Sequence, residues 1–185
     1  SNLVDASLGN GLTGIDDSAF SGCSEIESLV IPNSVKTIGS RAFYNCYRIK
    51  DLTLSDSLKV IDRSAFGNCK NITSLVLPDS LETIGISAFE ICEGLTSIHI
   101  PKNVKEIGDM AFYEARNIAS ITVDEGNKNF IVEDGVLYNK SKTELIAYPP
   151  QKEGTGFSVP EGVKTIKMSA FAYCKKLSNI TSLIP

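Results

Sequence analysis

The strongest signal in the chain is an apolar pattern that repeats every 23 residues. The dipeptide Ala-Phe occurs five times at this spacing, and a sixth copy follows after a gap of 59 residues. An isoleucine stands five residues before each phenylalanine, and a leucine or valine stands three residues before that isoleucine. The six phenylalanines are Phe20, Phe43, Phe66, Phe89, Phe112 and Phe171. So many columns in register predict a repeat protein in which each repeat forms one coil of a stack.

A short strand is predicted at the end of each repeat, where apolar and polar residues alternate. Residues 26–31 and 95–100 are examples, and a proline follows each of them. Strands that recur in the same chain direction pair as a parallel sheet, which a proline ends. The Ala-Phe pair is expected on a short helical turn on the opposite, convex side. Gly39, Gly85 and Gly108 follow the column isoleucines, and we expect them to supply a tight turn that needs a positive φ.

These elements predict a solenoid, a right-handed coil of 23-residue repeats with a parallel concave β-sheet and short helical turns. No single coil can bury its own apolar residues, so the stacked coils share one core. We expect residues 1–185 to form a single repeat domain. Neither end shows a polar capping repeat, and we therefore expect either a piece of a longer chain or a chain whose ends are shielded by some other means.

The long gap holds an irregular turn over residues 124–159. Residues 135–138 and 144–148 are predicted as two strands joined by a five-residue turn. This β-hairpin would replace the missing Ala-Phe pair on the convex side. Two interpretations of its aromatic residues are open, since they either roof the coil or form a lateral binding patch. These residues are Phe130, Tyr138 and Tyr148.

Composition narrows the classes of function. The chain has 18 Lys and Arg against 22 Asp and Glu, a net charge of −4, and nucleic-acid binders usually carry a basic face instead. No apolar run approaches the roughly 18 to 20 residues of a membrane helix. The N-terminus also lacks the basic and apolar regions of a signal peptide. The chain has one histidine, His99, which leaves little material for a Ser-His-Asp triad or a histidine-rich metal site.

All five cysteines occupy one column of the repeat, three residues after the phenylalanine. They are Cys23, Cys46, Cys69, Cys92 and Cys174. Neighbouring strands lie about 4.8 Å apart, with parallel Cβ directions in equivalent residues. A disulfide needs Cβ atoms about 3.8 Å apart whose Cα–Cβ directions converge. A zinc site needs four ligands directed at one point. We therefore predict a column of buried thiols, with disulfides and zinc as the alternatives.

Two further features are candidates for chemistry, a pair of aspartates and the single histidine. Asp56 and Asp79 are one period apart and so about 5 Å apart in the stack, close to the carboxylate spacing of retaining glycosidases. A solvated edge is the simplest interpretation of this pair, and a weak calcium site or a catalytic pair are the alternatives. His99 has no predicted Asp or Ser partner, so we interpret it as a surface residue. The sequence thus predicts no catalytic, cofactor-binding or metal-binding residue, and no enzyme.

The outward strand positions form the candidate binding face. Because side chains alternate along a strand, two residues per repeat point away from the core onto the concave side. The side chains of this face are small and weakly polar, and they include none of the Trp, Tyr and Arg residues that anchor many interfaces. Its residues are Ser28, Val30, Asp51, Thr53, Ser74, Val76, Ser97, His99, Ser120 and Thr122.

The copy from Leu95 to Ala115 resembles the BspA-like leucine-rich repeats, whose unit reads L-x-x-I-x-I-P-x-x-V-x-x-I-G-x-x-A-F-x-x-C. It departs from that pattern only at Ala115, and residues 132–140 also resemble a variant turn of the family. The resemblance implies a leucine-rich-repeat solenoid in a secreted or cell-surface protein. It further implies adhesion to a protein or glycan ligand, such as host matrix or another cell surface, and no catalytic motif or cofactor.

Two functions from different classes remain open at this stage. The first is a non-enzymatic, extracellular or cell-surface binding and adhesion module, which would use either the concave face or the hairpin. The second is a structural spacer that holds another domain away from the cell envelope. A polysaccharide-acting enzyme, the third class considered, would need a groove with clustered acids.

Overall fold

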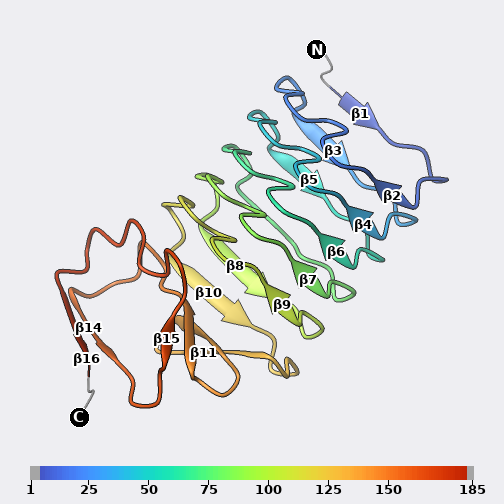
Figure 1. Cartoon of the computed structure of the whole chain (residues 1–185). Coiled ribbons are helices and arrows are strands. Elements are labelled where there is room, and N and C mark those ends of the chain that lie inside the picture. The colour runs from blue at the N-terminus through green and yellow to red at the C-terminus, as the bar shows by residue number, and fades with distance from the viewer. Residues whose placement is uncertain (1–4, 183–185) are drawn as a thin grey trace.

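The computed structural model describes residues 5–182, which form a stack of coils running from the N-terminal to the C-terminal end (Figure 1). We number the coils by the aromatic residue of their turn. Coils 1 to 5 carry Phe20, Phe43, Phe66, Phe89 and Phe112, coil 6 carries Tyr148 and coil 7 carries Phe171. The predicted β-solenoid with parallel strands at a 23-residue spacing is confirmed.

Two rows of short strands run along the stack. The first row lies where the sequence places the concave sheet. It contains β1 (Asp5–Ser7), β3 (Ser28–Val30), β5 (Asp51–Thr53), β8 (Ser97–Ile100), β10 (Ser120–Val123), β14 (Gly156–Val159) and β16 (Asn179–Ser182). The second row contains β2 (Gly14–Ile15), β4 (Thr37–Ile38), β6 (Val60–Ile61), β7 (Thr83–Ile84), β9 (Glu106–Ile107) and β15 (Thr165–Ile166).

The rings of the first five coils form one continuous column. Neighbouring ring centroids are 5.2, 5.3, 5.6 and 6.2 Å apart from Phe20 to Phe112, and each pair is stacked within 10° of parallel. Phe43, Phe66 and Phe89 are fully buried. Stacking therefore lets each coil bury its ring against its neighbours, as the repeat predicts.

The helical turns expected around the Ala-Phe pairs are absent, because the described residues contain no helix. The residue before each Ala-Phe pair has a positive φ, for example 55° at Arg41, and so does Asn45, at 64°. Two left-handed residues this close together interrupt a right-handed helix. The N–H groups of Arg41, Phe43 and Asn45 instead donate to carbonyls of the next coil, at 2.8, 2.8 and 2.9 Å.

The glycines that follow the column isoleucines have a different role from the one that the sequence suggests. Gly39, Gly85 and Gly108 are not among the residues with positive φ. A Cβ on Gly85 would lie 2.6 Å from the backbone carbon of Asp62, and one on Gly108 would lie 2.4 Å from the backbone nitrogen of Ile86. These glycines are needed because two coils approach each other closely there.

Coil 6 is built from the predicted hairpin. It comprises β12 (Val136–Asn139) and β13 (Glu144–Ala147), which pair antiparallel, and a further strand that the sequence analysis missed, β11 (Phe130–Glu133). β13 also pairs parallel with β15, so it takes the place of a second-row strand. The N–H of Tyr148 donates to the carbonyl of Ala170 at 2.8 Å, the bond that each ring residue of coils 1 to 4 makes to the next coil. Ala147-Tyr148 therefore stands in for the missing Ala-Phe pair.

β12 separates two hydrophobic cores. Leu137 belongs to the large core of coils 1 to 5, whereas Val136 and Tyr138 belong to a second core with Leu145 and Tyr148. Successive side chains of a strand point to opposite faces. This alternation explains why the apolar run at residues 136–138 is buried on both sides.

Candidate interaction surface

The structure brings together most of the predicted strand face, which we define as the ten outward residues named above. Nine of the ten are exposed and Ser28 is half-buried. Ser28 lies beside Asp51 and Val30 beside Thr53 in the parallel register. The ring Nδ1 of His99 lies 2.9 Å from the hydroxyl of Thr122, a hydrogen bond that the sequence did not predict.

The first strand row is broken in coil 3. Residues 73–77 have no strand assignment, although Ser74 and Val76 were expected to continue the sheet. No backbone hydrogen bond joins Ser74 or Val76 to the neighbouring coils within the described residues. Val76 is 77% exposed and Val30 is 55% exposed, so the strand face carries two apolar side chains open to a partner.

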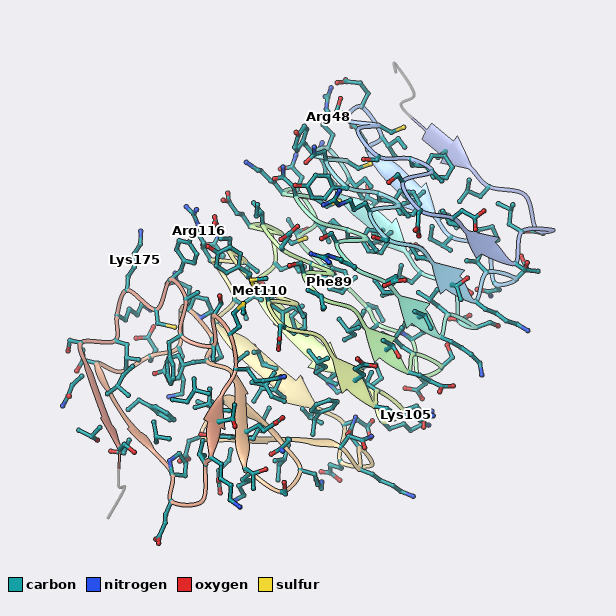
Figure 2. All side chains as sticks on the ribbon, viewed as in Figure 1. Arg48, Phe89, Lys105, Met110, Arg116 and Lys175 are labelled. Atoms are coloured by element: carbon teal, nitrogen blue, oxygen red, sulfur yellow. The ribbon has the colours of Figure 1, made fainter. Side chains whose placement is uncertain are left out.

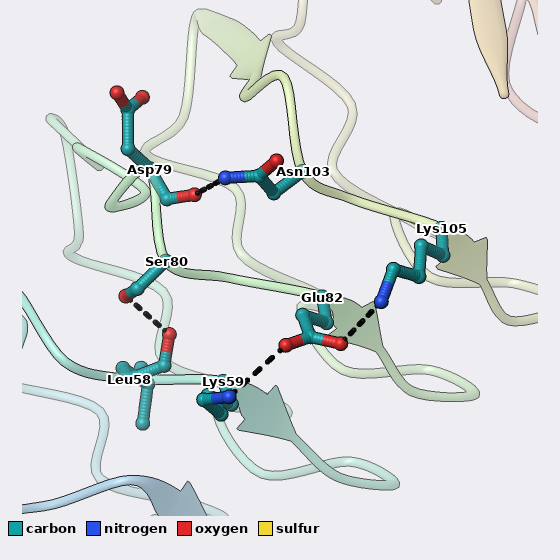
Figure 3. A network of polar contacts seen from close by, with 7 residues as sticks. All are labelled: Leu58, Lys59, Asp79, Ser80, Glu82, Asn103 and Lys105. Atoms are coloured by element: carbon teal, nitrogen blue, oxygen red, sulfur yellow. Dashed lines mark hydrogen bonds and ion pairs between the residues drawn. The ribbon is translucent and has the colours of Figure 1, made fainter. Parts of the chain in front are cut away.

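The second strand row carries a ladder of alternating charges. Glu82 accepts from Lys59 at 3.2 Å and from Lys105 at 2.6 Å, and the three side chains come from successive coils (Figure 3). The hydrogen bond from Lys105, with that from Lys59, lowers the pKa of the Glu82 carboxyl. The charges of these three side chains therefore alternate along the stack, and each is paired within the chain.

The two candidate carboxylates have separate partners. Asp56 is tied to Asn33, whose amide donates to its carboxylate at 3.1 Å. Asp79 forms an ion pair with Lys102 at 2.9 Å, and hydrogen bonding to Asp79 raises the pKa of Lys102. Within residues 5–182, no three His, Cys, Asp or Glu side chains gather closely enough to hold a metal ion. The contacts therefore favour the solvated edge.

All five cysteines are free of disulfides, and Cys46, Cys69 and Cys92 are buried as predicted. Cys23 and Cys174, near the two ends of the stack, are only partly buried. The thiols of Cys46, Cys69 and Cys92 each donate to the carbonyl of a phenylalanine in the preceding coil, at 3.2 Å. Burial raises the pKa of Cys46 and of Cys92 to about 12. Thiols of this kind are poor nucleophiles and poor metal ligands at neutral pH.

The aromatic residues of the hairpin are buried and cover the core of the coil. The prediction of a lateral binding patch is therefore wrong. Phe130 is 6% exposed, Tyr138 1% and Tyr148 3%. Their rings face the two cores because the strands of coil 6 have apolar residues on both faces.

Sequence reasoning missed a cluster of Tyr and Arg at the turns of coils 5 and 7. The guanidinium carbon of Arg116 lies 4.5 Å from the ring centroid of Tyr173, whose ring is 5.8 Å from that of Tyr113. Arg116 also pairs with Glu114. Hydrogen bonds with Tyr113 and Glu114 raise the pKa of Tyr173 to about 12. Coils 5 and 7 lie far apart in sequence, so the 23-residue period alone could not place these side chains together.

Among residues 5–182 the structure has no helix of the length and apolar character that a bilayer crossing requires.

Comparison with known proteins gives a consistent picture. The sequence profile described as BspA type leucine rich repeat region matches residues 13–144 and 151–183, in six copies. A search of curated proteins finds no match.

Three solved bacterial structures are similar to this chain. A leucine-rich repeat protein from Eubacterium ventriosum is 32% identical with a TM-score of 0.86, over 94% of this chain and 46% of that one. The pneumococcal vaccine antigen PcpA is 33% identical with a TM-score of 0.58, over 86% and 34%. A leucine rich cell surface protein from Faecalibacterium prausnitzii is 29% identical with a TM-score of 0.57, over 91% and 45%.

The chain spans less than half the length of each of these three proteins. The profile covers most of the sequence, and the stacked coils, the phenylalanine column and the close-packed glycines account for its positions in physical terms. The chain belongs to the BspA type leucine-rich repeat family.

Proposed function

We propose that this chain is a non-enzymatic binding module of a cell-surface or secreted protein. It acts as one repeat domain whose strand face contacts a protein or glycan. The observation that carries the proposal is a row of exposed side chains on a rigid stack, nine of ten open to solvent. Solenoids present extended surfaces of this type to their partners.

Two further observations support the proposal. The side chains of the charged ladder and of the thiol column already have hydrogen-bond partners within the chain. The strand face, in contrast, is an extended surface with exposed apolar side chains such as Val76. The surface location is supported by the neighbour from Faecalibacterium prausnitzii, which is a leucine rich cell surface protein.

The test is binding of the purified chain to an array of matrix proteins and glycans, with Val76→Arg and Thr53→Arg as variants. Arginine at these positions adds bulk and charge to the centre of the strand face. We expect both variants to lose binding by roughly tenfold or more, because a buried unpaired charge costs more than 1.4 kcal/mol.

The matched control is Ile86→Arg, since Ile86 is 41% exposed and lies on the turn away from the strand face. This variant is expected to bind as the parent does. Circular dichroism verifies that all three variants are folded. Binding that survives both strand-face changes would show that another surface is used.

A structural spacer is the second candidate. It is favoured by the strand face itself, whose serines and threonines offer few anchors for a tight interface. The complete reading frame distinguishes the two functions, because a spacer requires an anchor on one side of the repeats and a distinct domain on the other.

A further inference from the structure

The Ala-Phe turns of coils 1 to 5 are joined by a regular set of hydrogen bonds. In coil 4 the N–H groups of Ser87, Phe89 and Ile91 donate to carbonyls of coil 5 at 3.0, 2.8 and 2.7 Å. The same three positions of each earlier coil donate to the coil that follows it. A coil in this stack therefore presents three donors to its successor.

Coil 5 has the same donors but lacks acceptors. The N–H groups of Met110, Phe112 and Glu114 have no hydrogen-bond acceptor in the part of the chain that the structure describes. The φ angle is 58° at both Met110 and Glu114, against 55° and 58° at the equivalent residues of coil 4, so the donors point the same way, toward coil 6. In coil 6 the ring residue Tyr148 follows directly after the second-row strand β13, and no carbonyl of this coil accepts a hydrogen bond from the three N–H groups of coil 5 within the described residues.

A cavity of about 40 Å³ lies at this interruption. A water needs about 10 to 15 Å³ of such space, so the cavity has room for roughly three waters or for one branched aliphatic side chain. Both methionines of the chain, Met110 and Met168, line it together with Ile118 and Ile146. Tyr148 also lines it, and its hydroxyl is buried without a hydrogen-bond partner.

Ion pairs flank the cavity and neutralise its charged groups. Lys167 of coil 7 pairs with Asp109 of coil 5 at 3.0 Å, and Arg116 pairs with Glu114. Figure 2 shows Met110 and Arg116 on the side of the molecule where the yellow coils meet the brown C-terminal part. The site therefore combines open N–H donors, an apolar lining and no unpaired charge.

We propose that this cavity is the anchor point of a peptide-binding groove between coils 5 and 6. Its ligand is a neutral, extended segment of a partner protein, which places one aliphatic side chain in the cavity and its backbone carbonyls against the N–H groups of Met110, Phe112 and Glu114. This groove is separate from the strand face and exists whether or not that face binds a partner.

A peptide matches the site better than other ligands do. An extended chain carries carbonyls on alternate residues along one edge, and the donors of coil 5 also lie on alternate residues. The site has no unpaired positive charge to attract an anionic ligand, because Arg116 is paired with Glu114 and Lys167 with Asp109. An aliphatic chain without carbonyls would leave the donors unpaired. Methionines adapt their shape to different side chains, which suits a partner segment of variable sequence.

The test is an NMR titration of the ¹⁵N-labelled chain with N-acetyl-L-leucyl-L-alanine methylamide, whose acetyl and alanine carbonyls lie on the same edge when the peptide is extended and which carries one branched aliphatic side chain. We expect saturable shifts at the amides of Met110, Phe112 and Glu114 with a dissociation constant on the order of 1 mM, as is usual for a ligand of about 18 heavy atoms. The amides of Ser87, Phe89 and Ile91 are internal controls, because coil 5 already occupies them.

Two matched variants locate the ligand. Ala172→Leu fills the cavity that Ala172 lines and is expected to weaken binding roughly tenfold or more. Ser21→Leu places the same side chain at the equivalent position of coil 1, outside the cavity, and is expected to bind as the parent does.

Three outcomes would overturn the proposal. The first is the absence of saturable shifts at the three amides, which means that only water occupies the cavity. The second is equal binding by the Ala172→Leu and Ser21→Leu variants, each verified as folded by its spectrum. The third is equal or tighter binding of hexanoate, which would identify an acyl chain as the ligand. None of these three outcomes depends on whether the strand-face variants Val76→Arg and Thr53→Arg bind a partner.

Discussion

A buried phenylalanine of the column packs against the equivalent phenylalanines of the neighbouring coils. Phe66 is fully buried, and its ring stacks on Phe43 at 5.3 Å and on Phe89 at 5.6 Å. Loss of one ring therefore leaves a hole that opens onto two neighbouring coils, and the rings beside it cannot close the gap without leaving their own positions.

We expect Phe66→Ala to lower the free energy of unfolding by about 3 to 5 kcal/mol, the usual cost of removing a buried phenylalanine. Phe20→Ala is the control, because Phe20 is only partly buried and stacks on one ring. Its loss should be smaller, and urea unfolding of both variants measures the difference. Equal losses would contradict the column as the source of stability.

The thiol column predicts a loss of stability at high pH. The pKa values of Cys46 and Cys92 rise from 9.0 unfolded to about 12 folded, so the folded chain holds protons that the unfolded chain releases. Their stabilisation is complete below pH 9 and is lost between pH 9 and 12, at about 1.4 kcal/mol per pH unit for each thiol. Urea unfolding across this range measures the slope.

The double variant Cys46→Ala, Cys92→Ala should be less dependent on pH over the same range. Alanine is tolerated in this column, as Ala115 is fully buried at the equivalent position of coil 5. Unchanged slopes in the variant would assign the alkaline loss to other groups, such as Tyr138, whose pKa burial also raises to about 12.

At the scale of elements, the close contact between coils rests on glycine. Gly85→Ala would place its Cβ 2.6 Å from the backbone of Asp62, and backbone atoms cannot give way separately. We expect a loss of roughly 1 to 3 kcal/mol in the free energy of unfolding. Thermal or urea unfolding of the purified variant checks this value.

Gly67→Ala is the matched control for this prediction. Its Cβ would lie 2.8 Å from the side chain of Tyr44, which can rotate away. The loss should therefore be smaller than for Gly85→Ala. A larger loss at Gly67 would mean that the side-chain packing of the turn limits the fold more than the approach of the coils.

The repeat pattern predicts the regular elements and fails where the backbone departs from a common period. The strands, the phenylalanine column and the thiol column follow from columns of like residues. The turns do not, because left-handed residues as different as Arg41, Ser64 and Met110 share a position without sharing a side-chain property. Glycine can be needed for a positive φ or for close approach of two backbones, and at Gly85 the reason is close approach.

Coil 6 shows a second limit of prediction from sequence. Ala147-Tyr148 replaces Ala-Phe, but Leu145 stands three residues before the tyrosine instead of the usual five, so the columns no longer align. The strand face was predictable because it needs only alternation. The open donors of coil 5 were not, since they depend on what the next coil lacks.

For the whole molecule, the interruption between coils 5 and 6 predicts uneven protection of amides. In native-state hydrogen exchange, Met110, Phe112 and Glu114 should exchange at least tenfold faster than Ser87, Phe89 and Ile91, whose N–H groups are hydrogen-bonded. The two sets occupy equivalent positions of neighbouring coils, which makes each the control of the other.

The two cores should also respond separately to denaturant. Leu137 and the large core of coils 1 to 5 belong to one cluster, and Tyr138 and Leu145 to the second. We expect amides of the second cluster to lose protection at lower denaturant concentration, as repeat proteins unfold by local units. Loss of protection in one step across all coils would contradict this division.

The carbonyl-bonded cysteine column has a consequence for where such a stack can assemble. Its thiols remain reduced in the folded state, and none of the five cysteines is cross-linked. Folding therefore consumes no oxidising equivalents, and the reduction potential of the surroundings does not enter its equilibrium. Coils of this kind can be added in any number without a disulfide isomerase, in a reducing compartment as readily as in an oxidising one.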